Sequence, residues 1–347
     1  MKDKVLVLGP FPPPIHGQSL ATQNLRAQLA RAGYGLDTVD LSDGGLRKLF
    51  AHGAALLRIL KHQDHCYISL NSNSGMWLSA CLAFAARLRG RRLWMHHHSY
   101  AHLNRSLLAA RFLTALAGKR AVHIVLGHRM DSDLHTMFPG VRTSMVLNNA
   151  GLVDIPYTPR TERRSELTLG FLGNITVEKG ITAAIDTVVT CATKMNIRFV
   201  VGGPAQTREA EAEIHRVRTI LGGKFDYRGR LDHREKEAFF RDIDILLFPS
   251  FYKNEASPLV IFEALSAGVP VVATERGCIC EDVGRLGGRV IRQEFALNAI
   301  SAISELSEDI LSSSKNARRQ FELKLAEHFQ QFEEFAESLD VRGPRRR

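Results

Sequence analysis

The stretch Glu255-Ala-Ser-Pro-Leu-Val-Ile-Phe-Glu-Ala-Leu-Ser-Ala-Gly-Val-Pro-Val-Val-Ala273 joins the start of a helix to the strand that follows it. Ser257 is a favourable N-cap residue and Pro258 suits the first helical position, so we predict that a helix begins there. The amides of Leu259 and Val260 would then lie at its tip, where the helix dipole favours an anion. The stretch ends in a Val-rich run typical of a buried strand. It therefore indicates a helix and strand of a parallel sheet, with an anion site.

Two carboxylates bracket this predicted anion site. Glu263 lies on the same helix face as the free amides, and Glu255 lies in the loop before the helix. Carboxylates repel a phosphate but accept hydrogen bonds from sugar hydroxyls. The arrangement suits a nucleotide sugar. The alternative is an ordinary amphipathic helix start with incidental acids.

Short apolar runs alternate with helical segments along the whole chain, which is the pattern of an α/β protein with parallel sheets. At 347 residues, the chain is long enough for two domains. We predict a first series of strands at Val5–Leu8, Thr38–Leu41, Cys66–Leu70, Arg92–His96, His123–Leu126 and Ser144–Leu147. We predict a second series at Leu167–Leu172, Arg198–Val201, Asp226–Arg228, Ile245–Phe248 and Val271–Ala273.

The predicted boundaries follow these two series. Residues 1–155 form the N-terminal domain, 156–166 a linker rich in proline and charge, and 167–320 the C-terminal domain. Residues 321–347 form a C-terminal helix and a basic tail, and a return of this helix to the N-terminal domain stays open. The tail is either a solvated terminus or a contact for anionic lipid headgroups.

The net charge of +10 favours anionic partners such as phosphate ligands or anionic lipid surfaces. The basic residues match no recognised nucleic-acid-binding module, so we expect no nucleic-acid role. Five scattered cysteines favour a reducing compartment. The longest apolar stretch has about a dozen residues, whereas a membrane helix needs about 20. We therefore expect a cytoplasmic protein, with the inner face of the cytoplasmic membrane as an open location.

Several motifs that would indicate other chemistry are absent from the sequence. There is no GxGxxG fingerprint, no GxxxxGK[ST] phosphate loop and no HExxH zinc motif. Asp242-Ile-Asp244 resembles a metal-holding DxD, but it leads directly into the apolar run at Ile245–Phe248. We interpret it as the entry to a strand.

The Glu255 to Glu263 block and its trailing Gly-Val-Pro resemble the closing signature of the GT4-like retaining glycosyltransferases, members of glycosyl transferases group 1. The resemblance covers essentially the whole chain. It implies the GT-B fold, in which two Rossmann-like α/β domains with parallel sheets face an interdomain cleft. It also implies that Glu255 meets the transferred sugar as a catalytic residue, and that Glu263 holds the nucleotide ribose beside Ser257, Pro258, Leu259 and Val260.

Two further segments of the second series fit this resemblance. Phe171-Leu-Gly-Asn-Ile-Thr-Val-Glu-Lys-Gly180 resembles the loop in which an Arg and a Lys, five residues apart, grip the donor diphosphate. Lys179 matches the Lys, but Asn174 occupies the Arg position, and an amide cannot make the bidentate phosphate contact of a guanidinium. Gly203 falls in a Gly-Gly-Pro turn that resembles the family's nucleotide-facing turn.

The N-terminal half carries the expected acceptor side. The segment Gly9-Pro-Phe-Pro-Pro-Pro-Ile-His-Gly-Gln-Ser19 joins the first strand to a helix that we expect to start at Gln18–Ser19. Gly17 resembles the family's ligand-approaching glycine and is assigned to the donor, because a residue without Cβ lets the backbone come close. His16, Gln18 and Ser19 are assigned to the acceptor side.

Three adjacent histidines end the fourth predicted strand. Side chains alternate along a strand, so only His96 and His98 can share a ligand. Relatives carry a His here that positions sugar and acceptor; we assign His98 to catalysis and His96 to the acceptor side. A zinc site lacks a nearby carboxylate or Cys, and packed edge histidines are the plain alternative.

The resemblance implies same-face transfer of a sugar from a nucleoside-diphosphate donor, UDP- or GDP-linked, to an acceptor hydroxyl. It implies no cofactor and no metal. Charge and resemblance together favour a lipid-linked saccharide or polysaccharide intermediate as acceptor. Two alternatives stay open: a nucleotide-sugar epimerase of GT-B architecture, and a non-catalytic glycosyltransferase-like partner protein, which Asn174 would favour.

Overall fold

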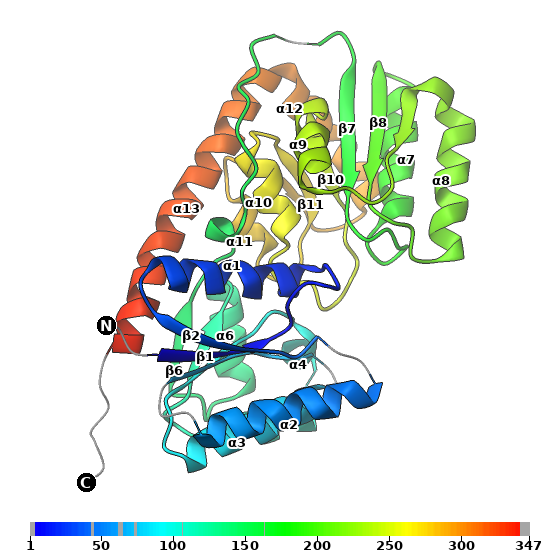
Figure 1. The fold of residues 1–347 in the computed structure, drawn as a ribbon. Helices are drawn as coiled ribbons and strands as arrows, with labels where there is room; N and C mark the ends of the chain where they lie inside the picture. The colour runs from blue at the N-terminus through cyan, green and yellow to red at the C-terminus, as the bar shows by residue number, and fades with distance from the viewer. Residues whose placement is uncertain are drawn as a thin grey trace. The chain divides into compact units, whose positions relative to one another are not determined.

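A computed structural model describes residues 4–42, 45–61, 65–72, 75–105, 107–162 and 164–340. The predicted basic tail from Val341 lies outside these residues. The chain divides into two compact units (Figure 1). Unit 1 holds the residues up to Leu152 together with those from Glu327 onward, and unit 2 holds Val153–Ala326.

Unit 1 is a parallel α/β unit built on one six-stranded sheet. Its strands are β1 (Lys4–Gly9), β2 (Gly35–Asp40), β3 (His65–Ser69), β4 (Leu93–His96), β5 (Val122–Val125) and β6 (Thr143–Val146). Its helices are α1 (Gly17–Arg31), α2 (Gly45–Lys61), α3 (Met76–Leu88), α4 (Ala101–Asn104), α5 (Leu108–Ala117) and α6 (His128–Met137), followed by the 3₁₀ turn η2 (Ala150–Leu152). All six predicted strands are present, with ends that differ by at most three residues.

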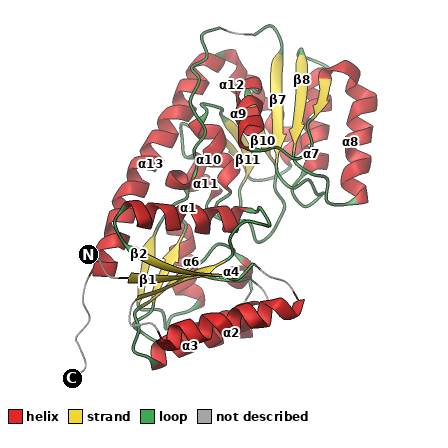
Figure 2. Ribbon diagram, in the orientation of Figure 1, coloured by secondary structure: helices red, strands yellow, loops and turns green. Residues whose placement is uncertain are grey.

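The sheet of unit 1 has the order β2-β1-β3-β4-β5-β6. Val5 of β1 pairs with Leu36 of β2 on one side and with His65 of β3 on the other. Helix α1 lies on one side of the sheet, and α2 and α3 lie on the other (Figure 2). The predicted apolar stripe of α1 is buried at Ala21, Leu25 and Leu29, and the helix ends before Gly33, whose φ of 87° suits glycine.

Unit 2 is built on a second six-stranded parallel sheet, in the order β12-β11-β10-β7-β8-β9. Its strands are β7 (Leu167–Leu172), β8 (Ile197–Gly202), β9 (Phe225–Tyr227), β10 (Ile245–Phe248), β11 (Val271–Thr274) and β12 (Gly288–Ile291). Its helices are α7 (Ile181–Ala192), α8 (Arg208–Leu221), α9 (His233–Asp242), α10 (Leu259–Ser266), α11 (Ile279–Val283) and α12 (Phe295–Glu308), with the 3₁₀ turn η3 (Gly222–Lys224).

Strand β12 was not among the predicted strands. Its sequence is Gly-Arg-Val-Ile, and the last three residues are only partly buried because it is an edge strand, so no apolar run marks it in the sequence. The other five strands match their predictions. Helices α7, α8 and α12 cover one face of this sheet, where Phe171, Phe199 and Leu247 join a buried apolar cluster.

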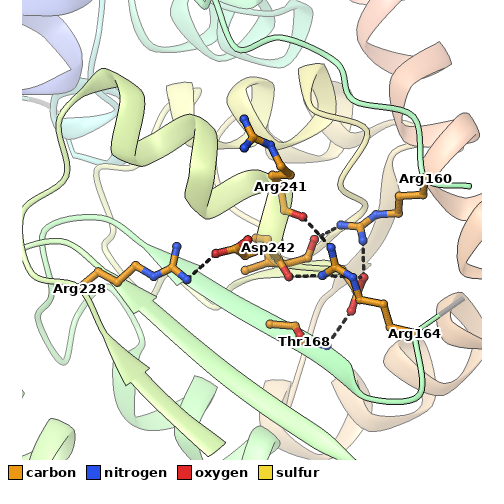
Figure 3. Close-up of polar contacts among 8 residues, drawn as sticks. Arg160, Arg164, Thr168, Arg228, Arg241 and Asp242 are labelled. Atoms are coloured by element: carbon orange, nitrogen blue, oxygen red, sulfur yellow. Dashed lines mark hydrogen bonds and ion pairs between the residues drawn. The ribbon is translucent and has the colours of Figure 1, made fainter. Parts of the chain in front are cut away.

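The predicted linker 156–166 is not a free connection, because two of its arginines are bound to the sheet and helix that follow. Arg160 forms an ion pair of 2.5 Å with the buried Asp244, and Arg164 donates to the carbonyl oxygens of Arg241 and Asp242 at the end of α9 (Figure 3). Cations at a helix C-terminus are favoured by the helix dipole. Arg160 and Arg164 therefore fasten this segment to the domain that follows it.

Asp242 and Asp244 serve as strand entry, as interpreted from the sequence. Asp244 accepts a hydrogen bond of 2.7 Å from the amide of Thr168, and Asp242 accepts one of 2.6 Å from Arg228 (Figure 3). Both carboxylates precede β10, at the edge where the parallel strands begin. Ligands of such sheets bind at the opposite edge, so this pair has a structural role.

The last helix, α13 (Ile310–Asp340), begins earlier than the predicted 321. Its residues from Glu327 onward belong to unit 1. There His328 contacts the carbonyl of Asn148 at 2.7 Å, and Ser338 accepts a hydrogen bond of 2.9 Å from Trp94. The C-terminal helix thus contributes residues to both units.

Candidate functional site

The sheet of unit 2 has a switch point between β7 and β10. The chain builds β7, β8 and β9 in one direction and then β10, β11 and β12 in the other. In an open parallel sheet, ligands usually bind at such a switch point, outside the carboxyl ends of the strands. The predicted donor residues Asn174 and Lys179 lie in the loop after β7, and Glu255 lies in the loop after β10.

Lys179 and Glu255 meet at this switch point. The ammonium of Lys179 donates to Glu255 Oε2 at 2.6 Å, and the hydroxyl of Ser250 donates to the same oxygen at 2.8 Å. The Lys179 ammonium also lies 5.0 Å from the centre of the Tyr252 ring. Glu255 is only 8% exposed, so these partners replace much of the water that its side chain loses on burial. Residues 76 positions apart in sequence thus form one charged centre.

Glu263 has a cationic partner of its own. Lys236 of α9 donates to Glu263 Oε1 at 2.7 Å, and Glu263 is 8% exposed. Sequence reasoning did not identify Lys236. It lies in a polar helix with several other charged residues, so its type and spacing give no signal.

Helix α10 begins at Leu259, with Pro258 in the N-cap position. The predicted N-cap role of Ser257 is wrong, because its hydroxyl donates to Asp282 of α11 at 2.9 Å instead. The free amides of Leu259 and Val260 still stand at the helix tip, since the first turn of an α-helix has no internal acceptors. The predicted anion site keeps its amides but loses its capping side chain.

Close backbone packing holds the two donor loops in place. Gly180 has a φ of 86°, and a Cβ built there would lie 1.9 Å from the carbonyl oxygen of Pro249. Gly203 has a φ of 112°, and its Cβ would lie 1.8 Å from the carbonyl oxygen of Gly173. Only glycine fits either position. The predicted turn at Gly203 is therefore packed against the loop that begins at Gly173.

Asn174 is exposed in that loop. Its neighbour Ile175 is buried and accepts a backbone hydrogen bond from Gln206 at 3.0 Å. Asn174 therefore presents its amide to solvent from an anchored segment.

The sheet of unit 1 has its switch point between β1 and β3. The side chain of Gln18 donates to the hydroxyl of Ser69 at 3.0 Å and to the carbonyl of Leu70 at 2.9 Å, which fastens the start of α1 to the end of β3. Helix α1 starts at Gly17, one residue before the predicted Gln18, because His16 is its N-cap.

His16 and Ser19 form a reciprocal cap. The amide of Ser19 donates to His16 Nδ1 at 3.2 Å, and the amide of His16 donates to the Ser19 hydroxyl at 3.1 Å. Ser19 is fully buried. The side chains of Gln18 and Ser19 are thus used to build the loop. Gly17 is exposed, and a Cβ there would meet nothing within 4 Å.

His96 and His98 lie side by side at the carboxyl end of β4, as the alternation predicts, with ring centroids 4.0 Å apart. His96 is buried and its Nδ1 lies 2.7 Å from the Tyr67 hydroxyl. The Nε2 atoms of both histidines are shielded from water and find no hydrogen-bond partner within the described ranges. Buried polar atoms without a partner are rare in folded proteins, which marks this pair of histidines as a place with a role beyond packing.

Burial keeps these imidazoles neutral. It lowers the pKa of His98 to about 3, with the nearby His16 adding to the effect. Burial also lowers the pKa of His96 well below its ordinary value, with His98 and His328 adding to the effect. A neutral imidazole both donates and accepts hydrogen bonds, so this pair suits a sugar hydroxyl and not a phosphate.

His97 points away into a separate buried chain of histidines. Its two ring nitrogens lie 2.9 Å from His102 Nε2 and 2.9 Å from His123 Nδ1. Over the residues that the structure describes, no three His, Cys, Asp or Glu side chains are placed to share a metal ion. No helix in the same residues is long and apolar enough to cross a bilayer.

Comparison with known proteins finds similarity to a glycosyltransferase family within unit 2. Residues 166–309 match the family model described as glycosyl transferases group 1. Over 119 residues the chain is 33% identical to a 2-deoxystreptamine glucosyltransferase of Streptomyces kanamyceticus. That match covers 34% of this chain and 30% of the relative, so less than a third of the relative's length is matched.

Solved structures resemble the chain over nearly its full length. Anabaena HepE in complex with UDP-glucose has a TM-score of 0.70 at 16% identity, covering 96% of this chain and 99% of that one. WaaG, a glycosyltransferase involved in lipopolysaccharide biosynthesis, has a TM-score of 0.66 at 14% identity, covering 96% and 99%. At these identities the likeness establishes the fold. The expected architecture of two parallel α/β domains is confirmed.

Proposed function

Because residues 166–309 form a domain of the group 1 glycosyl transferases and the chain has the GT-B fold, we propose that it transfers a sugar from a nucleotide-sugar donor to an acceptor hydroxyl. The observation that carries this proposal is the ion pair of Lys179 and Glu255 at the switch point of unit 2. A cation for a diphosphate and a carboxylate for sugar hydroxyls stand there side by side.

The donor would occupy the carboxyl edge of unit 2. Its diphosphate would lie at the tip of α10, against the amides of Leu259 and Val260, and would compete with Glu255 for the Lys179 ammonium. Glu263, positioned by Lys236, would accept hydrogen bonds from the ribose hydroxyls. The crystal complex of HepE holds UDP-glucose, which supports a UDP-linked donor as the first choice; a GDP-linked donor is the second.

Chemistry then requires stabilisation of the leaving diphosphate. Lys179 and the helix amides would carry this charge, which is the role of preorganised donors in group transfer. We propose transfer with retention, in which the leaving phosphate takes the proton of the acceptor hydroxyl. Glu255 would hold the transferred sugar, and His98 with His96 would bind sugar or acceptor hydroxyls. No metal takes part in this scheme.

The proposed acceptor is a lipid-linked saccharide or a polysaccharide intermediate. The net charge of +10 supports it, since an enzyme acting at an anionic surface gains from positive charge. The stated involvement of WaaG in lipopolysaccharide biosynthesis supports the same acceptor class. We place the enzyme in the cytoplasm, at the inner face of the membrane.

Thermal unfolding with UDP, GDP, ADP and their common sugars tests the donor site. A nucleotide that binds only the folded state raises stability by about 2.7 kcal/mol at a hundredfold excess over Kd. We expect one nucleotide family to raise the midpoint of the wild type and of Glu211→Ala, an exposed acid on α8, but not of Glu263→Ala. If none of these nucleotides raises the thermal midpoint, the result would favour a non-catalytic partner protein. Donor turnover without any acceptor would favour the epimerase.

A further inference from the structure

The positive charge of the chain is concentrated in one quarter of it. Residues 44–130 contain thirteen Lys and Arg residues and one acidic residue, Asp64. The whole chain has a net charge of +10, so this segment accounts for all of the excess. Positive charge confined to one part of a domain indicates an anionic partner for that part.

Three helices of this segment form a single layer on unit 1. Helices α2, α3 and α5 pack side by side, α2 on α3 and α3 on α5. They cover the side of the sheet opposite α1, as Figure 1 shows for α2 and α3. None of the three helices contains an Asp or Glu.

The outer face of this layer is strongly apolar. Of the seventeen large apolar side chains that are exposed in the described ranges, ten lie on these three helices. They are Leu49, Phe50, Leu56, Leu57, Leu60, Trp77, Phe84, Leu88, Leu108 and Phe112. Phe50 is 78% exposed, and the Trp77 and Phe112 rings lie 5.3 Å apart across two helices. Scattered apolar residues need no explanation, but a contiguous set indicates an interaction surface.

Cations surround this apolar face. Arg47, Arg58, Lys61, Arg89, Arg111, Lys119 and Arg120 are exposed on the helices or directly after them. At the end where β4 and β5 begin, a cavity of about 640 Å³ is lined by Arg87, Arg91, Lys119 and Arg120. Arg87 also donates to the carbonyl of Ala115 at 3.0 Å, which orients its guanidinium. The cavity thus suits a phosphate group.

We propose that the outer face of α2, α3 and α5 docks on the surface of an anionic phospholipid membrane. Its apolar side chains would enter the boundary between headgroups and acyl chains, and its cations would pair with lipid phosphates. Nucleic acid fits the charge but not a face of Leu, Phe and Trp. A protein partner fits the apolar residues but gives no reason for a layer that lacks acidic residues.

This docking surface extends the membrane location in the proposed function and rests on it only for the lipid-linked acceptor. Crossover helices run antiparallel to the strands of a parallel sheet, so α2, α3 and α5 begin near its carboxyl edge. Phe50, Trp77 and Leu108 stand near those helix starts. His98 lies at the same edge. A membrane held by this face therefore brings a lipid-linked acceptor towards the proposed acceptor residues.

Vesicle flotation tests the surface. The full chain is mixed with vesicles of phosphatidylcholine alone or of phosphatidylcholine with phosphatidylglycerol, without any donor. We expect binding to the anionic vesicles and weak binding to the neutral ones. The charge-reversed variant Lys119→Glu with Arg120→Glu should bind anionic vesicles at least roughly 30-fold more weakly, because each of the two lost cations contributes about fivefold and the new carboxylates add repulsion.

Two matched controls distinguish binding through this surface from the effects of net charge and of exposed apolar residues elsewhere. Arg208→Glu with Arg218→Glu on α8 makes the same change in net charge at exposed positions of unit 2. Phe50→Ser with Leu57→Ser should weaken binding, whereas Ile220→Ser with Leu297→Ser, also exposed and apolar, should not. Far-ultraviolet circular dichroism and thermal midpoints confirm that each variant is folded.

Three outcomes would overturn the proposal: equal binding to neutral and anionic vesicles, equal losses in the α8 control, or self-association that Phe50→Ser abolishes without any vesicle binding. The same samples are tested for donor-induced thermal shifts. A chain that floats with anionic vesicles but binds no nucleotide keeps the docking surface and rejects the transferase. A chain that binds nucleotide but does not float with vesicles keeps the proposed transferase and rejects the docking surface.

Discussion

At the scale of single residues, the candidate donor site depends on two lysine–glutamate pairs. Lys179 with Glu255 and Lys236 with Glu263 each join a nearly buried carboxylate to a more exposed ammonium. A buried carboxylate is costly without its cation, because few other groups replace the lost water. Each pair therefore sets the position of a carboxylate before any ligand arrives.

Replacing Lys179 should abolish most of the activity. Lys179→Met keeps the length of the side chain but removes the charge that would stabilise the leaving diphosphate. We expect kcat to fall about 10²- to 10³-fold, the usual cost of one such electrostatic group. The fall in kcat is measured by steady-state kinetics with a sugar donor of the nucleotide family that the thermal shifts identify. Lys194→Met, at an exposed site after α7, is the control, and an equal loss there would contradict the role.

Lys236 should act as a positioning residue. In Lys236→Met, Glu263 loses its partner, and we expect the donor KM to rise by roughly tenfold or more with a smaller change in kcat, since a charge-assisted hydrogen bond contributes about 1.5–3 kcal/mol. Lys236→Arg should restore most of the affinity. A fall in kcat at unchanged KM would mean that Lys236 acts on the chemical step instead.

At the scale of elements, the loops after β7, β8 and β10 are locked together by glycine contacts and not by side chains alone. Gly180 stands against Pro249, and Gly203 stands against Gly173. Lys179 immediately precedes one of these contacts. The backbone packing of these two loops therefore sets the position of the Lys179 ammonium.

Gly180→Ala should lower both stability and activity. The new Cβ would meet the carbonyl oxygen of Pro249 at 1.9 Å, at a φ of 86° that alanine disfavours. We expect a loss of at least about 2 kcal/mol in the free energy of unfolding, measured by urea denaturation. Gly223→Ala is the control, because its Cβ would meet nothing within 4 Å. If the free energy of unfolding of Gly180→Ala equalled that of the wild type, the loops would move apart at little cost, which would contradict this account.

The elements also show where prediction from the sequence was sufficient. Strands such as β7 and β10 are buried along nearly their whole length and consist mainly of apolar residues because both faces of a parallel sheet are covered, so their bounds were predicted correctly. The edge strand β12 lacks that signal. The N-cap of α10 was predicted from residue type, but Ser257 has a better partner in Asp282 of another helix.

At the scale of the whole molecule, unit 1 buries an unusual set of neutral histidines. Burial lowers the pKa of His123 to about 3 and that of His102 to about 4, and it lowers the pKa of His97 well below its ordinary value. These three rings form one hydrogen-bonded chain, and the His102 ring stacks on Phe138. The folded state therefore excludes protons that the unfolded chain binds.

Stability should consequently fall in mild acid. Below a pH of about 6.5 the unfolded histidines gain protons and the folded ones do not, so each contributes a loss of up to about 1.4 kcal/mol per pH unit until its own lowered pKa is reached. Urea midpoints between neutral pH and the lowered pKa values measure this slope. His102→Gln, which keeps a hydrogen-bonding side chain, should reduce the slope. A slope as steep in His102→Gln as in the wild type would contradict this account.

The sequence alone determined the α/β class, two series of parallel strands and the positions of Lys179, Glu255 and Glu263, because these depend on local apolar runs and on a contiguous motif. Only the tertiary structure decided that Lys179 meets Glu255, that Lys236 holds Glu263, and that α2, α3 and α5 present one apolar and cationic face. The physical reason is the same in each case. These contacts join residues that lie on different elements, and no local pattern records which elements the folded chain brings together.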